Sequence, residues 1–99
     1  MNRNRKEIMR LLRENREAIR TFGVRSLALF GSAARDEATE SSDLDFLVEF
    51  ETKTFDAYMD LKAFLEELFD CRVDLVLRDA LKSRLRDPIL RSAVHVPGL

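Results

Sequence analysis

The stretch DLDFLVEF at residues 43–50 constrains the fold of this chain more than any other. Successive side chains of a β-strand point to opposite faces, so a strand here has one face made only of apolar side chains. The opposite face begins with Asp43 and Asp45, whose Cα atoms would lie about 7 Å apart. The stretch therefore predicts a strand that packs against helices on one side and carries paired carboxylates on the other. The predicted apolar face consists of Leu44, Phe46, Val48 and Phe50.

The paired carboxylates indicate a cation. Two ionised carboxylates at this separation repel each other, which lowers stability unless one takes a proton or a cation lies between them. A small set of oxygen ligands suits Mg²⁺ or Mn²⁺, because these ions keep bound waters and accept substrate oxygens. Asp43 and Asp45 are therefore candidate ligands of a divalent metal ion.

A Gly-Ser pair precedes this strand in the sequence. Gly31 and Ser32 follow the apolar run Leu27–Phe30 and come before Ala33-Ala34-Arg35, which is a good helix start. Glycine lets the backbone approach a ligand closely, the serine hydroxyl can donate a hydrogen bond, and the N–H groups that open a helix favour an anion. The segment predicts a phosphate-binding turn next to the carboxylates.

A third acid lies on a later predicted strand, from about Arg72 to Leu77. Asp74 alternates there with Val73 and Leu75, on a strand whose other residues suit burial. A buried carboxylate without a cation or a donor is costly. Asp74 therefore either pairs with an arginine or, if its strand lies beside residues 43–50, adds a third carboxylate to the site.

Two motifs in this part of the chain resemble a known signature. Gly31-Ser32-Ala33-Ala34-Arg35, a short spacer and then Ser42-Asp43-Leu44-Asp45 resemble the GSxAR…SDxD pattern of the DNA polymerase beta-like nucleotidyltransferases. The length of the chain resembles that of the minimal nucleotidyltransferase (MNT) group, often the antitoxin half of HEPN/MNT toxin–antitoxin pairs. The resemblance covers nearly the whole chain, and it departs from the family at Asp36, where glycine is common.

The resemblance implies a role for each site residue. Gly31 and Ser32 would hold the phosphates of ATP, and one or two Mg²⁺ ions would bind the carboxylates. With the motif present, Asp74 is better interpreted as the third ligand than as an ion-pair partner. Arg35 would contact phosphate or a partner, or else pair with Asp36, Glu37 or Glu40. The predicted catalytic and metal-binding residues are Asp43, Asp45 and Asp74, and the predicted nucleotide-binding residues are Gly31, Ser32, Arg35 and Ser42.

The resemblance also implies an activity. The protein would act as an antitoxin by transferring AMP from ATP to a hydroxyl, that of a tyrosine, on a cognate HEPN ribonuclease toxin. The alternative is a non-catalytic antitoxin that neutralises its toxin by binding and occlusion. Transfer to a small molecule such as an aminoglycoside is disfavoured, because enzymes of that kind generally carry a further domain for the acceptor.

The predicted architecture is a single domain, residues 1–99, of the α/β (α+β) class. It has a small mixed sheet with helices packed on one face, as in the polymerase beta-like nucleotidyltransferase fold. The hydrophobic patterns predict one helix over Arg5–Thr21, a strand over Val24–Phe30, and a helix from an N-cap at Thr54 to about Asp70. A short helix should begin at Pro88 with Asp87 as its cap, and Pro97 and Gly98 should leave the end loose.

The composition sets limits on partners and location. With 45% hydrophobic and 35% charged residues, no apolar run approaches membrane-spanning length. The single cysteine, Cys71, has no partner for an internal disulfide, so a reducing cytoplasm is the simplest setting. Formal charge is uneven, at +6 for residues 1–35, −10 for 36–74 and +3 for 75–99. The acidic middle favours a metal ion, and no direct contact with nucleic acid is expected. The only histidine, His95, is assigned no role.

Overall fold

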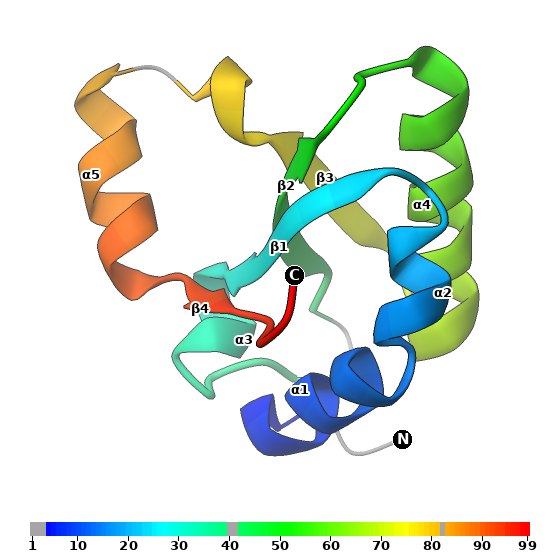
Figure 1. Cartoon of the computed structure of the whole chain (residues 1–99). Helices are drawn as coiled ribbons and strands as arrows, with labels where there is room; N and C mark the ends of the chain where they lie inside the picture. Colours follow the sequence, from blue (N-terminus) through cyan, green and yellow to red (C-terminus); the bar gives the residue numbers. More distant parts are fainter. Residues whose placement is uncertain (1–3, 40–41, 82) are drawn as a thin grey trace.

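A four-stranded mixed sheet forms the centre of the computed structural model, which describes residues 4–39, 42–81 and 83–99 (Figure 1). The strands lie in the order β3-β2-β1-β4. The elements, in chain order, are α1 (Arg5–Glu14), α2 (Arg16–Arg20), β1 (Val24–Phe30), α3 (Gly31–Ala34), β2 (Leu44–Phe50), α4 (Phe55–Phe69), β3 (Val73–Leu77), the 3₁₀ helix η1 (Arg78–Ala80), α5 (Ser83–Ser92) and β4 (Val94–His95).

Strand β2 lies in the middle of the sheet and pairs differently on its two sides. It runs antiparallel to β1, with Phe30 opposite Asp45, and parallel to β3, with Asp45 opposite Asp74. The predicted mixed sheet is therefore confirmed, as is the prediction that Asp74 lies on the strand next to Asp45. The end of β1 and the start of β3 meet at the start of β2.

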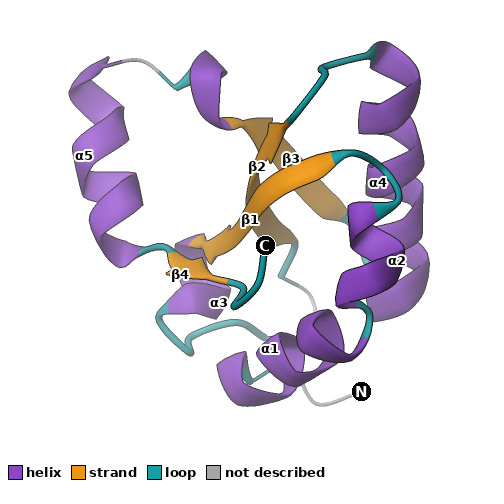
Figure 2. Ribbon diagram, viewed as in Figure 1, coloured by secondary structure: helices purple, strands orange, loops and turns teal. Residues whose placement is uncertain are grey.

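The apolar face of β2 packs as its alternation predicts. Leu44, Phe46 and Val48 are almost completely buried, and the Phe46 ring stacks on that of Phe69 with centroids 5.9 Å apart. The helical residues of this core come mainly from α1, α2 and α4, which lie together on one side of the sheet (Figure 2). The prediction of helices on one face is confirmed for these three. Helix α5 lies on the other side in Figure 2 and contacts β1 and α3.

The prediction of one N-terminal helix over Arg5–Thr21 is wrong, because two helices meet at Asn15. The Asn15 backbone has a ψ of 14°, and its side-chain amide donates to the Leu11 carbonyl at 2.8 Å. Asparagine competes for backbone hydrogen bonds in this way, which favours helix ends over helix interiors. Gly23, with a φ of 80°, follows α2 and leads into β1.

The C-terminal helix begins earlier than predicted. Helix α5 starts at Ser83, so Pro88 is its sixth residue and Asp87 is inside the helix, where neither serves as a helix start. A proline at this position removes one backbone donor and the bond it would make. The residues before Pro88 are already helical. The preference of proline for the first helical turn therefore does not mark where α5 begins.

The prediction of a loose C-terminus is also wrong. Residues 94–95 form β4 on the edge of β1, and the buried Val96 donates its N–H to the Leu27 carbonyl at 2.9 Å. Arg16 Nη1 donates to the Pro97 carbonyl at 3.2 Å, and Arg20 donates to that of Gly98. The chain end is therefore tied both to the sheet and to α2.

Helix α4 has the predicted ends. Thr54 caps it by accepting from Ala57 N at 3.0 Å, and Asp70 ends it in the left-handed conformation, with a φ of 51°. Leu61, Leu65 and Phe69 recur at helical spacing and are buried, so they form one core-facing stripe of this helix. The half-buried Phe64 and Leu68 pack against the same core.

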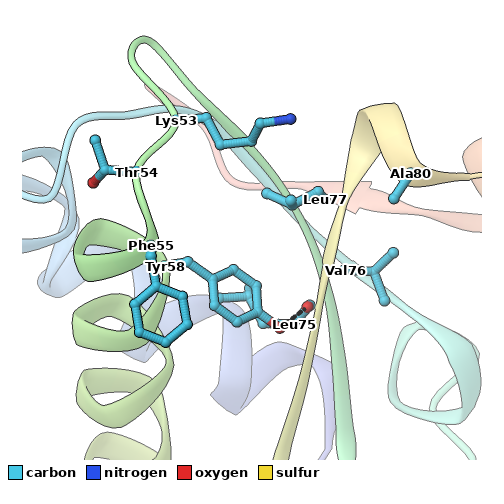
Figure 3. Close-up of a pocket in the computed structure, with 8 residues that line it drawn as sticks. All are labelled: Lys53, Thr54, Phe55, Tyr58, Leu75, Val76, Leu77 and Ala80. Atoms are coloured by element: carbon cyan, nitrogen blue, oxygen red, sulfur yellow. Dashed lines mark hydrogen bonds between the residues drawn. The ribbon is translucent and has the colours of Figure 1, made fainter.

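Helix α4 also covers the outer edge of β3. The Tyr58 hydroxyl donates to the Leu75 carbonyl at 2.6 Å (Figure 3), and Val73 N donates to Glu66 Oε2 at 3.1 Å. Unpaired edge groups of a sheet invite pairing with another chain. The two side chains satisfy alternate positions of this edge and so protect it.

We expect Tyr58→Phe to lower the free energy of unfolding by about 0.5–1.5 kcal/mol, because the variant keeps the ring and loses one hydrogen bond. Urea unfolding followed by circular dichroism measures this change. The control is Phe55→Leu on the same helix, where the side chain is 76% exposed and substitution should cost less than about 0.5 kcal/mol. Equal stability of Tyr58→Phe and the wild type would contradict the contribution of this bond.

Candidate active site

Asp45 occupies the centre of the predicted site. It is half-buried on the face of β2 opposite to Phe46, between its register partners Phe30 and Asp74. Asp43 precedes the strand, and both Asp43 and Asp74 are exposed. The structure therefore brings a partly shielded carboxylate next to two solvent-facing ones.

Gly31 lies directly against the Asp45 carboxylate. Its φ is 73°, and a Cβ added to Gly31 would lie 2.3 Å from Asp45 Oδ2. Any other residue at this position would have to displace that carboxylate and adopt a strained backbone. The close approach predicted at Gly31 was that of a ligand, and it remains a prediction. The group that lies against the Gly31 backbone in this structure is the Asp45 carboxylate.

The turn after Gly31 is a four-residue helix. Helix α3 begins at Gly31 itself rather than at the predicted Ala33. Ala33 and Ala34 are buried in the core, which fixes the helix against the sheet, and Ser32 is half-buried between them and Gly31. The burial of the two alanines holds the Gly31–Ser32 backbone beside the start of β2.

The pKa of the Asp45 carboxyl is raised above its usual value of 3.8. Burial is the largest cause, followed by the negative charges of Asp74 and Asp43, while the positive charge of Arg35 opposes them. The ionised form of Asp45 is therefore disfavoured by its surroundings. A cation among the three carboxylates would remove this penalty.

This raised pKa predicts a pH-dependent stability difference between the wild type and Asp45→Asn in EDTA. The folded state holds the Asp45 proton more tightly than the unfolded state, so ionised Asp45 destabilises the fold at pH values above its folded pKa. Asp45→Asn should therefore be more stable than the wild type near pH 7. The difference should shrink as the pH falls through the folded pKa and vanish below 3.8.

Urea unfolding at a series of pH values measures this difference. A stability gain that stayed constant from neutral pH to below 3.8 would contradict the role of the Asp45 charge.

Arg35 lies beside the carboxylates without binding them directly. Its Nε donates to Glu37 Oε2 at 3.2 Å, and both side chains are more than half exposed. Pairing with Glu37, one of the predicted alternatives, is therefore confirmed. An exposed ion pair of this kind is weak, so the guanidinium can exchange Glu37 for a stronger anion.

Ser42 orders the approach to Asp43. Its hydroxyl accepts from Thr39 N at 3.0 Å and lies 3.1 Å from Thr39 Oγ1, and Ser42 N donates to the Thr39 carbonyl. These bonds close a turn immediately before the first acid of the motif. The structure thus gives Ser42 a role in shaping the loop, and its predicted contact with the nucleotide remains a prediction.

Asp74 forms no ion pair with an arginine among the residues that the structure describes, although such a pair was the predicted alternative. Asp74 instead faces Asp45 across the parallel register and contributes to its raised pKa. This arrangement favours the third-ligand interpretation of Asp74.

The three acids carry the oxygen ligands that a divalent cation such as Mg²⁺ prefers. Within residues 4–39, 42–81 and 83–99, no three acidic, histidine or cysteine side chains approach closely enough to form a ready-made metal cage. Mg²⁺ does not need one, because it keeps several waters and binds through one or two carboxylates together with substrate phosphates. The negative charges of Asp74 and Asp43 contribute to the raised pKa of Asp45, and a bound cation would offset this repulsion.

Two residues of this region were missed by sequence reasoning. Asp36 adopts a φ of 61°, and its Oδ1 accepts from Arg5 N at 2.9 Å, while Arg5 Nη1 donates to the Ala34 carbonyl at 3.1 Å. The sequence did contain a signal, because the chain has Asp36 where the family commonly has glycine. A position that favours glycine is one whose backbone adopts a positive φ.

An apolar hollow of about 590 Å³ lies elsewhere, between the start of α4 and the end of β3 (Figure 3). It contains none of the predicted site residues. Its lining consists of Lys53, Thr54, Phe55, Tyr58, Leu75, Val76, Leu77 and Ala80.

Among the helices described, none is both long and apolar enough to cross a membrane.

Comparison with known proteins gives one consistent result. The family model described as "Nucleotidyltransferase domain" matches residues 8–96. Protein adenylyltransferase MntA of Thermococcus cleftensis is 41% identical over 92 residues, which cover 91% of this chain and 93% of that protein. A provisionally named protein adenylyltransferase of Methanocaldococcus jannaschii is 42% identical over 79 residues, covering 78% of this chain and 81% of the relative.

Solved structures agree with these relatives. A provisionally named minimal nucleotidyltransferase superposes with a TM-score of 0.72 and 43% identity, covering 87% of this chain and 93% of that one. A toxin–antitoxin structure with AMP-PNP superposes with a TM-score of 0.66 and 26% identity, covering 97% of this chain and 74% of the other. The predicted resemblance is confirmed, and the chain belongs to the nucleotidyltransferase domain family.

Proposed function

We propose that this nucleotidyltransferase acts as an antitoxin by transferring AMP from ATP to a tyrosine hydroxyl on a cognate HEPN ribonuclease toxin. Three similarities support the proposal. A relative of nearly the same extent is a protein adenylyltransferase, one structural neighbour is a toxin–antitoxin with AMP-PNP, and another is the MntA-HepT toxin–antitoxin, at 25% identity and a TM-score of 0.57.

The observation that carries the proposal is the register of the three strands. It aligns the β1 end, where Gly31 follows Phe30, with Asp45 and with Asp74. An enzyme that transfers a nucleotidyl group needs phosphate contacts and carboxylates at one place, and this alignment brings the Gly31 turn next to the carboxylates. Such an arrangement has no purpose in a protein that only occludes its partner, because the carboxylates repel one another.

Asp43, Asp45 and Asp74 would hold one or two Mg²⁺ ions. When bound, the metal supplies charge stabilisation at the α-phosphate and at the departing pyrophosphate. The backbone at Gly31 and the Ser32 hydroxyl would bind the outer phosphates of ATP. Ser42 would keep the loop before Asp43 in place, as its bonds to Thr39 already do in this structure.

The transfer itself forms a bond between the acceptor oxygen and the α-phosphorus and breaks the bond from that phosphorus to pyrophosphate. The hydroxyl proton must leave the acceptor oxygen. Asp74 is exposed at the start of β3, and it would accept this proton if the attacking hydroxyl binds beside it. Arg35 would exchange Glu37 for a phosphate oxygen and so balance part of the negative charge.

One assay with three criteria separates modification from occlusion: the amount of protein needed, the effect of EDTA, and whether inhibition lasts after the protein is removed. The cognate toxin is incubated with one tenth of an equivalent of this protein, ATP and Mg²⁺, and its ribonuclease activity is measured after the protein has been removed. Lasting inactivation that EDTA prevents supports the proposal. Inhibition that needs an equimolar amount, survives EDTA and disappears when the protein is removed would instead establish a binding antitoxin.

A further inference from the structure

The phosphate-binding segment is held from a distant part of the chain. Asp36 and Arg5 are separated by 31 positions in sequence, yet the Asp36 carboxylate accepts from Arg5 N at 2.9 Å. The Arg5 guanidinium donates in the opposite direction, to the Ala34 carbonyl at 3.1 Å. These two hydrogen bonds join the first residue of α1 to the last residue of α3 and to the turn that follows it.

Each hydrogen bond of this link uses a backbone group at a helix end that has no partner within its own helix. The N–H of the first residue of a helix has no partner inside the helix, and a negative charge is favourable there. Asn4 caps the same helix by accepting from Glu7 N at 2.7 Å, so Asp36 supplies a second cap from outside. At the other end, the Ala34 carbonyl is one of those that helix α3 leaves unpaired.

The link has a backbone cost at Asp36. Its φ of 61° lies in the left-handed region, where aspartate is tolerated and glycine is preferred. A glycine at this position would adopt the turn more easily and would lose the carboxylate. Asp36 therefore combines a less favourable backbone conformation with a side chain that reaches α1.

The position of α3 matters because Gly31 leaves no spare room. A Cβ added to Gly31 would lie only 2.3 Å from Asp45 Oδ2. A small movement of the α3 backbone therefore changes its distance from the central carboxylate. A displacement of about 1 Å at a distant support can cost up to about 100-fold in rate.

We propose that Asp36 and Arg5 are positioning residues that hold the α3 backbone at the separation from Asp45 that nucleotide binding requires. This inference rests on the proposed function, in which Gly31 and Ser32 bind the phosphates of ATP. It assigns to α1 a role in the site although the helix supplies no group to the nucleotide.

Three substitutions at Asp36 separate the side chain from the backbone. Asp36→Asn keeps the acceptor oxygen and tolerates the left-handed backbone, Asp36→Gly keeps only the backbone, and Asp36→Ala keeps neither. The probe is Mg-AMP-PNP, and its Kd is measured by calorimetry. Because a hydrogen bond is worth a few-fold to about tenfold in an equilibrium, we expect a Kd near that of the wild type for Asn and about fivefold weaker binding for Gly and Ala.

The matched control is Asp70→Gly. Asp70 also has a positive φ, of 51°, and it ends α4 without taking part in the Asp36–Arg5 link. The substitution should raise the Tm and leave the Kd unchanged, which separates relief of backbone strain from loss of the link.

A second variant tests the other end of the link. Arg5→Pro removes both donors, and the extended backbone of Asn4, with a ψ of 157°, accepts a following proline at the first position of a helix. If the link acts as a unit, Arg5→Pro and Asp36→Gly should each weaken binding, and the double variant should bind about as weakly as either single one.

The outcomes are distinct. A wild type that fails to bind Mg-AMP-PNP overturns the proposed function and this inference together. A wild type that binds, with Asp36→Gly and Arg5→Pro binding equally well, overturns only the positioning role. If the affinities of these two variants fall merely in proportion to their Tm, and Asp36→Asn does not restore binding, the link is structural and the inference is wrong.

Discussion

Asp45→Asn should lower the rate of AMP transfer by about 10³-fold or more while the protein remains folded. The substitution keeps the size of the side chain and removes its charge, so the loss measures the carboxylate at the centre of the site. Removing one preorganised electrostatic group commonly costs about 10²–10³ in kcat, and loss of a metal ligand adds to this cost. The measurement is the single-turnover rate of transfer from radiolabelled ATP to the cognate toxin.

Glu49→Gln provides the matched control for this variant. Glu49 lies on the same strand and the same face as Asp45, is half-buried as well, and lies towards the other end of β2. Its variant should transfer AMP at the rate of the wild type. Full activity in Asp45→Asn would remove the basis for assigning the metal to this carboxylate.

Gly31→Ala should have the second largest effect, with transfer reduced by about 100-fold and the free energy of unfolding lowered by about 1–3 kcal/mol. The added Cβ would lie 2.3 Å from Asp45 Oδ2, and the φ of 73° is unfavourable for alanine. The carboxylate must therefore move or the turn must open. Transfer rate and urea unfolding of the same preparation measure the two effects.

Gly23→Ala isolates the backbone contribution. Gly23 has a φ of 80°, and nothing lies within 4 Å of the Cβ that would be added. This variant should lose about 1–2 kcal/mol of stability for the left-handed conformation alone and keep its activity. If Gly31→Ala behaved in the same way, its contact with Asp45 would have no part in function.

The centre of the fold could be predicted from the sequence because its signals are local and strong. The alternation over residues 43–50 correctly separated the apolar face of β2 from its acidic face, since a strand has a side-chain period of two. Alternation alone did not place Asp74 beside Asp45. The resemblance implied it as the third acid, and the parallel register puts the two residues opposite each other. The glycine at 31 was predicted to let a ligand approach the backbone, whereas the structure shows the Asp45 carboxylate against it.

The remaining features depend on contacts that no local pattern contains. Strand β4 exists because residues 94–95 pair with β1, and two residues say little about that pairing on their own. At the break, the Asn15 side-chain amide donates to the Leu11 carbonyl, which the Asn15 backbone N–H also donates to. The Asp36–Arg5 link joins positions 31 residues apart, so only the folded chain brings them together.

The most direct test of nucleotidyl transfer is intact-mass spectrometry of the cognate toxin after incubation with this protein, ATP and Mg²⁺. An Asp43→Asn/Asp45→Asn double variant serves as the inactive control. We expect the toxin to gain the mass of one or more AMP groups with the wild type and none with the double variant. An unchanged toxin mass accompanied by full inhibition of its ribonuclease activity would contradict catalysis and leave binding as the mode of neutralisation.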